Sequence, residues 1–320
     1  MRYIASDHMN DNPQTTRLQH GTQPDPALLL PFVALILGAI GTGASPIFVR
    51  LTDVGPFASA FWRMALAIPV LWAWLKIERA RGRVKPVDLK TDYPIIVLLG
   101  FLFAGDLFFW HLAILNTSIT NATLLATTTP LVVAFGAWLF LKEKITKRIM
   151  IGVSAGMLGA GLLMGASATF NPDNLFGDIS GFITAFFFGS YFLAVAFARR
   201  HMSSAQVMFY PSIVCAGFLF IAAYMLDDHI IPRTWQGFGW LVALALISQL
   251  GGQGFVAYAL GHLPAIFSSL VLFLEALAAA FLAWLIFSEP ITISQLGGGL
   301  LILAGIYAAR PGRDKPPAHS

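Results

Sequence analysis

Ionisable side chains inside long apolar stretches are the first candidates for chemistry in this sequence. Arg63, Asp106, His111 and Glu275 each lie well within such a stretch. A charged group at the centre of a bilayer costs at least about 2.5 kcal/mol, so residues of this kind face a cavity or a partner and usually serve a function. We therefore treat these four residues as candidates for a site inside a membrane.

Glu275 is the sharpest of these candidates, because it stands between Leu274 and Ala276 with long apolar flanks. As a carboxylate it would bind a cationic or amino group of a substrate. As a carboxylic acid it would couple transport to a proton gradient, since a buried carboxyl group can exchange a proton when its surroundings change. The alternative is a neutral glutamic acid that donates one hydrogen bond to a neighbouring helix.

Arg63, Asp106 and His111 each admit a functional and a structural interpretation. Asp106 would line the outer half of a cavity, or form a pair with Arg63 that locks two helices together, and we favour the pair. Arg63 would bind a substrate carboxylate through two hydrogen bonds, or extend toward the outer surface of the membrane. His111 is interpreted as a hydrogen-bonded structural residue. No metal site is predicted, because His111 and His262 are too far apart in the sequence to suggest one.

Neutral polar and aromatic side chains complete the predicted substrate pocket. In the run from Thr127 to Pro130, the proline donates no backbone hydrogen bond, and the carbonyl groups freed in this way can line a cavity. Gln249 and Gln253 are four residues apart and share one helix face. Trp62 is a further candidate for an aromatic wall. The predicted substrate-binding residues are Glu275, Thr129, Gln253, Tyr258, Arg63, Asp106, Trp110, Gln249, Thr128 and Tyr191.

The elements that carry these residues are predicted to be membrane-spanning helices. The chain of 320 residues is 57% hydrophobic and only 11% charged, whereas soluble domains are about 25% charged. A helix crosses the hydrocarbon core in roughly 20 apolar residues. The predicted fold class is all-α integral membrane, with ten transmembrane helices at Leu28–Leu51, Pro56–Ile77, Tyr93–Leu115, Ile119–Leu141, Ile149–Ala166, Ile179–Phe197, Ala205–Met225, Trp235–Ala257, Leu263–Phe287 and Ile293–Ala309.

The basic residues are distributed very unequally between the loops. With the N-terminus in the cytoplasm, seventeen of the 20 Lys and Arg residues fall on the cytoplasmic side. Only Arg50 and Arg233 fall outside, and Arg63 lies within a span. Cytoplasmic loops of membrane proteins carry such an excess. The sequence therefore predicts a multi-pass protein of a bacterial inner (cytoplasmic) membrane with both termini cytoplasmic, residues 1–26 being a disordered tail and 311–320 a second tail.

An internal repeat divides the chain into two halves of five helices. A shift of 146 positions aligns Glu143 with Glu289, each followed after one residue by Ile-Thr. The same shift aligns a pair of tryptophans and three pairs of glycines. Because five is an odd number, the second half must be inverted in the membrane relative to the first, a plan that many secondary transporters use around a site at the midplane. The two repeats are predicted at residues 27–168 and 175–310.

Several motifs carry a resemblance to a known family: Phe61-Trp62-Arg63, Thr129-Pro130, Leu139–Thr146, Gly251–Gly254, Tyr258–Ala265 and Phe287–Thr292. The chain resembles the drug/metabolite transporter superfamily in its ten-helix form with two EamA domains, over roughly Leu28 to Ala309, which is nearly all of the chain between the predicted tails. The resemblance implies a transporter, and relatives of this kind include YddG-like exporters of amino acids and other metabolites. Many relatives carry Gln-Pro where this chain has Glu275-Ala276, so the chain lacks a proline kink there and its pocket is expected to differ from theirs.

The leading hypothesis is a secondary transporter that works by alternating access and exports amino acids or related compounds, with the export direction implied by the resemblance alone. The alternatives are a multidrug carrier, or a nucleotide-sugar carrier that would need more basic residues than Arg63. A membrane enzyme is disfavoured because loops 171–178 and 227–233 are too short for a nucleophile or metal cluster, and a sensor because neither tail is long enough for a signalling domain. No phosphate-binding Gly-Lys-Ser/Thr motif occurs, so an ATP-driven motor is not expected. The expected partners are a small-molecule substrate and the lipid bilayer, with no nucleic acid, no cofactor, and a monomer or weak homodimer.

Overall fold

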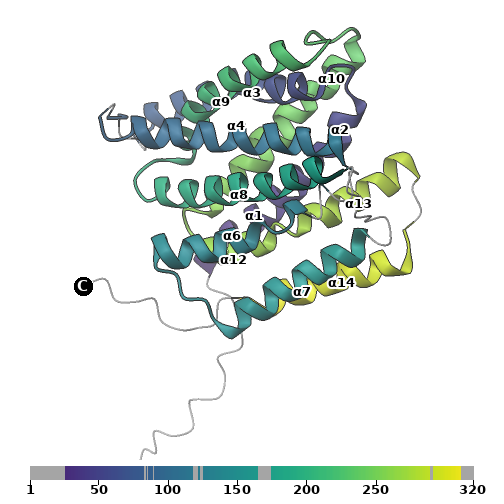
Figure 1. Ribbon diagram of the computed structural model, residues 1–320. Coiled ribbons are helices and arrows are strands. Elements are labelled where there is room, and N and C mark those ends of the chain that lie inside the picture. The colour runs from purple at the N-terminus through teal and green to yellow at the C-terminus, as the bar shows by residue number, and fades with distance from the viewer. Residues whose placement is uncertain are drawn as a thin grey trace, which may run out of the picture.

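The regular elements in the described part of the chain are all helices, which stack in layers from α3 and α9 at one side of the molecule to α7 and α14 at the other (Figure 1). The computed structural model describes residues 26–82, 84, 86–88, 90–117, 122, 125–164, 174–288 and 291–310. The predicted tails, except residue 26, lie outside these residues, as do Lys85 and the Glu289-Pro290 pair of the second repeat.

Ten helical segments cross the molecule, which confirms the predicted all-α class. Among the described residues, seven helices are long and apolar enough to cross a membrane. The elements of the ten segments are, in order, α1 (Pro26–Gly43) with α2 (Ser45–Leu51); α3 (Pro56–Ala80); α4 (Tyr93–Asn116); α6 (Thr129–Gly136) with the π-helix η1 (Ala137–Leu141); α7 (Lys147–Met164); α8 (Leu175–Ala198); α9 (Ser204–Leu226); α10 (Trp235–Ala243) with the π-helix η4 (Leu244–Gln253) and α11 (Gly254–Ala259); α12 (Ala265–Val271) with α13 (Leu274–Phe287); and α14 (Ile293–Ala308).

The loops that carry most of the basic residues meet at one end of the molecule. Arg79, near the end of α3, donates a hydrogen bond to Tyr210 on α9. Arg199, which follows α8, donates to the carbonyl oxygen of Ala257 in α11 at 2.8 Å. Glu143 accepts a hydrogen bond of 2.7 Å from the first backbone N–H of α12. The ends of the four loops joined by these contacts therefore gather as the charge pattern predicts, and we call this end the basic end.

The loops at the opposite end are tied together by two acidic residues. Asp53 accepts hydrogen bonds from the hydroxyl and backbone N–H of Thr234 at 2.7 and 2.8 Å, and these bonds lower the pKa of Asp53. Asp227 accepts a bond of 2.5 Å from the backbone N–H of Ala58 at the start of α3, while partial burial raises the pKa of Asp227. Carboxylates stabilise helix N-termini because unpaired N–H groups point at them.

The backbone conformation repeats with the same shift of 146 positions as the sequence. Among the described residues, Lys142 and Ser288 are the non-glycine residues with positive φ, at 60° and 55°. They are 146 positions apart and end the fourth and ninth segments. Lys142 lies beside the Glu143 contact at the basic end, whereas Ser288 follows Phe287, whose ring lies 4.3 Å from the guanidinium carbon of Arg50 at the opposite end. Matching positions therefore lie at opposite ends, as inverted repeats require.

The pairing of helices follows the same symmetry. The third segment, α4, packs against the sixth and seventh segments, α8 and α9. In the same way the eighth segment, through η4, packs against the first and second segments, α1 and α3. The shift of 146 positions converts each of these contacts into another one of the set. The fifth and tenth segments, α7 and α14, pack against each other. The described part of the molecule is thus a pseudo-twofold arrangement of two five-helix halves.

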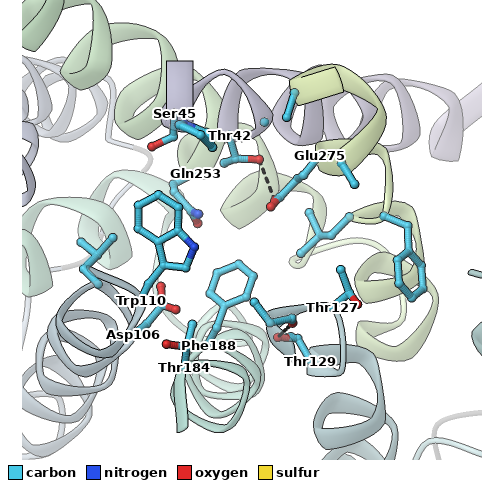
Figure 2. Close-up of a pocket in the computed structure, with 18 of the residues that line it drawn as sticks. Thr42, Ser45, Asp106, Trp110, Thr127, Thr129, Thr184, Phe188, Gln253 and Glu275 are labelled. Atoms are coloured by element: carbon cyan, nitrogen blue, oxygen red, sulfur yellow. Dashed lines mark hydrogen bonds between the residues drawn. The ribbon is translucent and has the colours of Figure 1, made fainter. Parts of the chain in front are cut away.

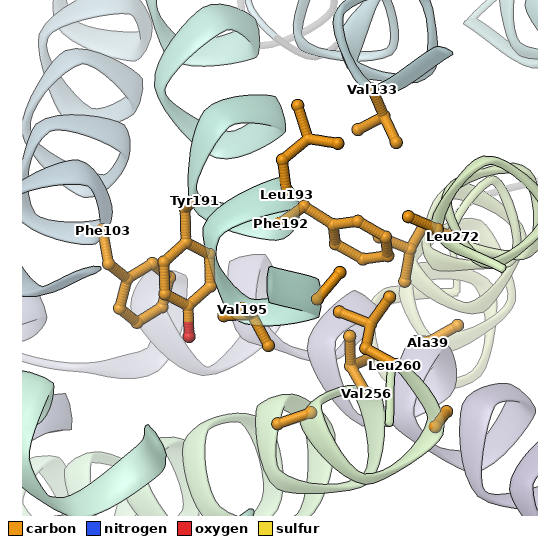
Figure 3. Packing of buried hydrophobic residues seen from close by; sticks show 14 of the residues in the cluster. Ala39, Phe103, Val133, Tyr191, Phe192, Leu193, Val195, Val256, Leu260 and Leu272 are labelled. Carbon is orange, nitrogen blue, oxygen red and sulfur yellow. The ribbon is translucent and has the colours of Figure 1, made fainter. Parts of the chain in front are cut away.

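The core between the two halves consists of side chains from both repeats. Figure 3 shows Leu193 of α8 facing Val133 of α6, and Phe192 of α8 facing Leu272 of the ninth segment. Phe103 of α4 stacks on Tyr191, with ring centres 4.6 Å apart. Many large apolar side chains on the outside of the helices are exposed in the isolated chain. Such a surface is stable against lipid rather than water.

Candidate functional site

A cavity of about 190 Å³ lies between the two halves of the molecule and is lined by residues of both (Figure 2). Its walls run from the middle of the bundle toward the end opposite the basic end, because Ser45 and Pro46 of α2, Trp110 of α4 and Ala279 of α13 all contribute to them. Of the residues predicted from the sequence, those that line the cavity are Arg63, Asp106, Trp110, Thr129, Gln253 and Glu275.

Thr129 and Glu275 reach the cavity because the fourth and ninth segments are both interrupted there. α6 begins at Thr129 after a turn, and Pro130 at the next position has no N–H to donate. α13 begins at Leu274 after a turn, where the N–H of Glu275 bonds to the carbonyl of Leu272 at 2.9 Å, three residues back instead of four. The ninth segment therefore breaks at this position without a proline.

Glu275 is hydrogen-bonded to Thr42 of α1 across the cavity wall. The Thr42 hydroxyl lies 2.7 Å from Oε1 of Glu275 and 3.0 Å from the carbonyl oxygen of Gly38. A hydroxyl has one proton to donate. Thr42 can therefore donate to a Glu275 carboxylate, or accept from a protonated Glu275 while it donates to Gly38. The contact fits both protonation states of the acid.

The close approach of α1 to Glu275 depends on a residue without a side chain. A Cβ atom at Gly43 would lie 2.5 Å from the carbonyl oxygen of Glu275 and 2.9 Å from the Cβ of Ala278. Any larger residue would push α1 away from α13. The distance between the Thr42 and Glu275 side chains thus depends on the close contact between Gly43, the residue after Thr42, and the backbone of Glu275.

Arg63 is held at the cavity wall by three neighbours. Its Nε donates to Oε1 of Gln249 at 3.0 Å, and its Nη1 donates to the hydroxyl of Ser45 at 3.2 Å. Its guanidinium carbon lies 5.6 Å from the centre of the Phe103 ring, within the range of a cation–π contact. Because Arg63 is only 6% exposed, the alternative in which it extends to the membrane surface is wrong.

Asp106 lies on the same face of α4 as Phe103, one turn further along, and is 8% exposed. Among the described residues, no basic nitrogen lies within 4.0 Å of its carboxylate. The favoured interpretation, a pair with Arg63 that locks two helices, is therefore corrected: the two groups interact electrostatically but form no direct ion pair. Figure 2 shows Asp106 on the same wall of the cavity as Thr184, whose hydroxyl is buried and has no hydrogen-bond partner in the described part of the chain.

Two of the predicted residues lie directly behind the cavity wall. Gln249 accepts the hydrogen bond from Arg63, and Tyr191 stacks on Phe103. Both side chains are buried and hold lining residues in place. We therefore interpret them as positioning residues for Arg63 and Phe103.

Other predicted residues lie away from the cavity. The Thr128 hydroxyl donates back to the carbonyl of Leu125 at 2.6 Å. Tyr258 is near the basic end, where its ring centre lies 4.6 Å from that of His262. Trp62 donates to the carbonyl of Ile230 at the opposite end.

His111 is buried and hydrogen-bonded to the backbone of its own helix. Its Nδ1 lies 2.6 Å from the carbonyl oxygen of Leu107, one turn earlier on α4. Its Nε2 lies 3.5 Å from the hydroxyl of Ser59 on α3. These contacts agree with the structural interpretation of this histidine.

Several lining residues were not predicted from the sequence, namely Thr42, Ser45, Thr184, Ser269 and Phe188. The repeat contained a signal for two of them. Thr42 and Phe188 are 146 positions apart, just as Thr129 and Glu275 are, and six pairs of lining residues match in this way. Isolated Ser and Thr residues in apolar helices are too common to identify a pocket by themselves.

Comparison with known proteins identifies the family. The model of the EamA-like transporter family matches residues 29–165 and again 175–310. A pseudopaline exporter, CntI, of Pseudomonas aeruginosa is 25% identical over 222 residues, which cover 69% of this chain and 76% of that protein. An uncharacterised transporter of Archaeoglobus fulgidus is 25% identical over 271 residues, covering 82% and 90%.

Similarity also extends to a third relative and to a solved structure. The uncharacterised transporter YoaV of Bacillus subtilis is 24% identical over 268 residues, covering 81% of this chain and 88% of that protein. A solved crystal structure superimposes with a TM-score of 0.73 at 19% identity and covers 89% of this chain and 96% of that chain, which supports the fold. The chain therefore belongs to the EamA-like transporter family, and it is a multi-pass membrane transporter with two EamA domains rather than an enzyme.

Proposed function

We propose that this protein is a secondary transporter, YddG-like in function, that exports amino acids or related small compounds across a bacterial inner membrane by alternating access. The observation that carries the proposal is the pair of interrupted segments that meet at the central cavity, with Thr129 and Glu275 at matching positions of inverted repeats. Two related packings of inverted repeats can exchange around a central site, which opens it to each side of the membrane in turn.

The direction of transport and the orientation follow from two further observations. The basic end of the molecule is the expected cytoplasmic side, and this supports our proposal that both termini are cytoplasmic. The Pseudomonas aeruginosa relative is an exporter by name. We therefore propose export from the cytoplasm, by a monomer or weak homodimer.

Glu275 is the proposed site of proton coupling. Its hydrogen bond with Thr42 can be made in either protonation state, because the Thr42 hydroxyl has a second acceptor in Gly38. A proton can therefore be bound or released without leaving a buried group unpaired. This property suits a residue that must change charge during each transport cycle.

A nucleotide-sugar carrier is less well supported by the cavity. Among the described lining residues, Arg63 is the only Lys or Arg. Two of its donors are occupied by Gln249 and Ser45. A diphosphate normally requires several basic groups or backbone N–H donors around it.

The test is a flux measurement on the purified full-length chain in liposomes. Labelled L-leucine is exchanged with and without an imposed pH gradient, for the wild type and for Glu275→Gln. We expect exchange without a gradient to persist in E275Q, while acceleration by the gradient is lost. The exposed Asp228→Asn variant serves as the control for loss of an acidic residue.

Two results would contradict the proposal. A response of E275Q to the pH gradient equal to that of the wild type would remove Glu275 from the coupling. Absence of exchange for every amino acid tested, with a correctly folded protein, would remove amino-acid export and leave only membership of the transporter family.

A further inference from the structure

Two polar groups in the cavity are buried without a protein partner. Asp106 is 8% exposed as a residue, and within the described residues its carboxylate has neither a hydrogen bond nor an ion pair. The Thr184 hydroxyl is 2% exposed and also has no partner there. Buried polar groups that lack partners are costly. A ligand with several N–H donors would satisfy both, because a carboxylate only accepts hydrogen bonds and a hydroxyl can accept as well as donate.

The guanidinium group of Arg63 also lines the cavity, and some of its N–H donors have no acceptor among the described residues. A guanidinium has five N–H donors in a planar fork. Gln249 and Ser45 accept from Nε and Nη1, and among the described residues no acceptor is found for Nη2. The remaining donors suit a carboxylate, which guanidinium groups bind through two parallel hydrogen bonds.

The Arg63 and Asp106 groups are close without touching. The Arg63 guanidinium lies over the ring of Phe103, and Asp106 follows Phe103 by three residues on the same helix face. Their nitrogen and oxygen atoms nevertheless remain more than 4.0 Å apart. Opposite charges that are neighbours in an enclosed space and do not pair leave room for a ligand that carries both charges.

The carboxyl group of Glu275 interacts electrostatically with Arg63 and Asp106, but it is already hydrogen-bonded to Thr42. We propose that Asp106 and Thr184 bind the ammonium group of a zwitterionic substrate and that Arg63 binds its carboxylate. The inference rests on the proposed transport function and specifies the substrate class: small compounds with an ammonium and a carboxylate group on neighbouring atoms. Trp110, Phe188 and Leu107 offer apolar surface to the substrate side chain.

The experiment measures competition for exchange of labelled L-leucine by the full-length chain in liposomes. The competitors are L-leucine, N-acetyl-L-leucine, which lacks the ammonium group, and 3-methylbutylamine, which lacks the carboxylate. In the wild type, leucine should compete at least about 10-fold better than either analogue, since one hydrogen bond to a charged group is worth about 1.5–3 kcal/mol. Asp106→Asn should lower the apparent affinity for leucine by about 10- to 100-fold.

The control variants separate recognition from folding. Asp106→Asn should leave the weak competition by N-acetyl-L-leucine unchanged, because that analogue has no ammonium group to lose. Thr184→Val should have a smaller effect in the same direction. Asp228→Asn, an exposed acid outside the cavity, should behave as the wild type.

The outcomes distinguish this inference from the transport proposal. If leucine and N-acetyl-L-leucine compete equally in the wild type, or if D106N weakens both equally, the zwitterion subsite is wrong. If labelled 3-methylbutylamine is exchanged and leucine is not, transport stands and the subsite is overturned. If the wild type exchanges none of the three compounds, amino-acid transport and the subsite fail together.

Discussion

Gly159 and Gly161 are two residues apart on α7 and meet different surroundings. A Cβ atom at Gly159 would lie 2.6 Å from the carbonyl oxygen of Gly298 on α14, whereas nothing lies within 4 Å of one at Gly161. Gly152 and Gly305 form the symmetry-related contact, with a Cβ at either lying 2.9 Å from the carbonyl oxygen of the other. Close approach of two helix backbones is the usual role of small residues at such crossings.

These surroundings predict opposite effects of the same substitution. Gly159→Ala should lower the free energy of unfolding by about 1–3 kcal/mol, because its methyl group has to displace the α14 backbone. Gly161→Ala should be neutral or stabilise by up to about 1 kcal/mol, since alanine favours a helix more than glycine does. Thermal unfolding of the two purified variants in detergent compares them directly. Equal destabilisation would show that the α7–α14 contact is not made as described.

The two halves of the ninth segment differ in how they are held. Each residue of α12 is buried, whereas none of α13 is. Lys142, whose backbone is in the left-handed conformation, ends η1 and turns the chain. The Glu143 carboxylate therefore faces the start of α12. Its two oxygens accept from the N–H groups of Ala265 and Ile266 at 2.7 and 3.0 Å. This helix start has no side-chain cap of its own, so a residue of the other repeat supplies one.

Removal of this carboxylate should destabilise the protein through α12. Glu143→Ala should lower the free energy of unfolding by about 1–2 kcal/mol, which is the usual range for loss of a helix N-cap together with its charge. Glu143→Gln should lower the free energy of unfolding by less than Glu143→Ala does, because the amide keeps one acceptor oxygen. The neighbouring exposed Lys144→Ala provides the control in the same melting experiment. An E143A variant as stable as K144A would mean that the contact does not stabilise the native state.

On the scale of the whole molecule, the two ends have different chemistry. Described basic residues that follow α3, η1, α8 and α14, such as Lys142 and Arg199, lie at one end, while Asp53 and Asp227 tie the loops at the other end. Since inverted repeats have nearly the same shape in either orientation, loop charge is the feature that distinguishes one side of the membrane from the other.

Reporter fusions test this arrangement. A reporter placed after Gly82 and one placed after Arg310 should both report a cytoplasmic location, and one placed after Asp228 should report the outer side. If the Gly82 and Arg310 fusions reported opposite sides, the ten-segment arrangement would be wrong, because an even number of crossings separates them. Fusion at Arg200 supplies a third cytoplasmic position from the second repeat.

The sequence by itself determined the number of spans, the repeat, the charge asymmetry and the pairing of Thr129 with Glu275. These properties depend on hydropathy along the chain and on similarity between its two halves, and both can be determined from the sequence without the three-dimensional structure. The confirmed all-α class and the family follow from the same information.

Only the tertiary structure decided which polar groups meet. Asp106 does not pair with Arg63, Thr42 bonds to Glu275, and Tyr258 lies away from the cavity. The spans are apolar on nearly every face, because lipid and protein neighbours are both apolar, so no hydrophobic stripe shows how each helix is rotated. That rotation follows from backbone contacts such as the approach of Gly43 to Glu275, and it determines which side chains enter the cavity.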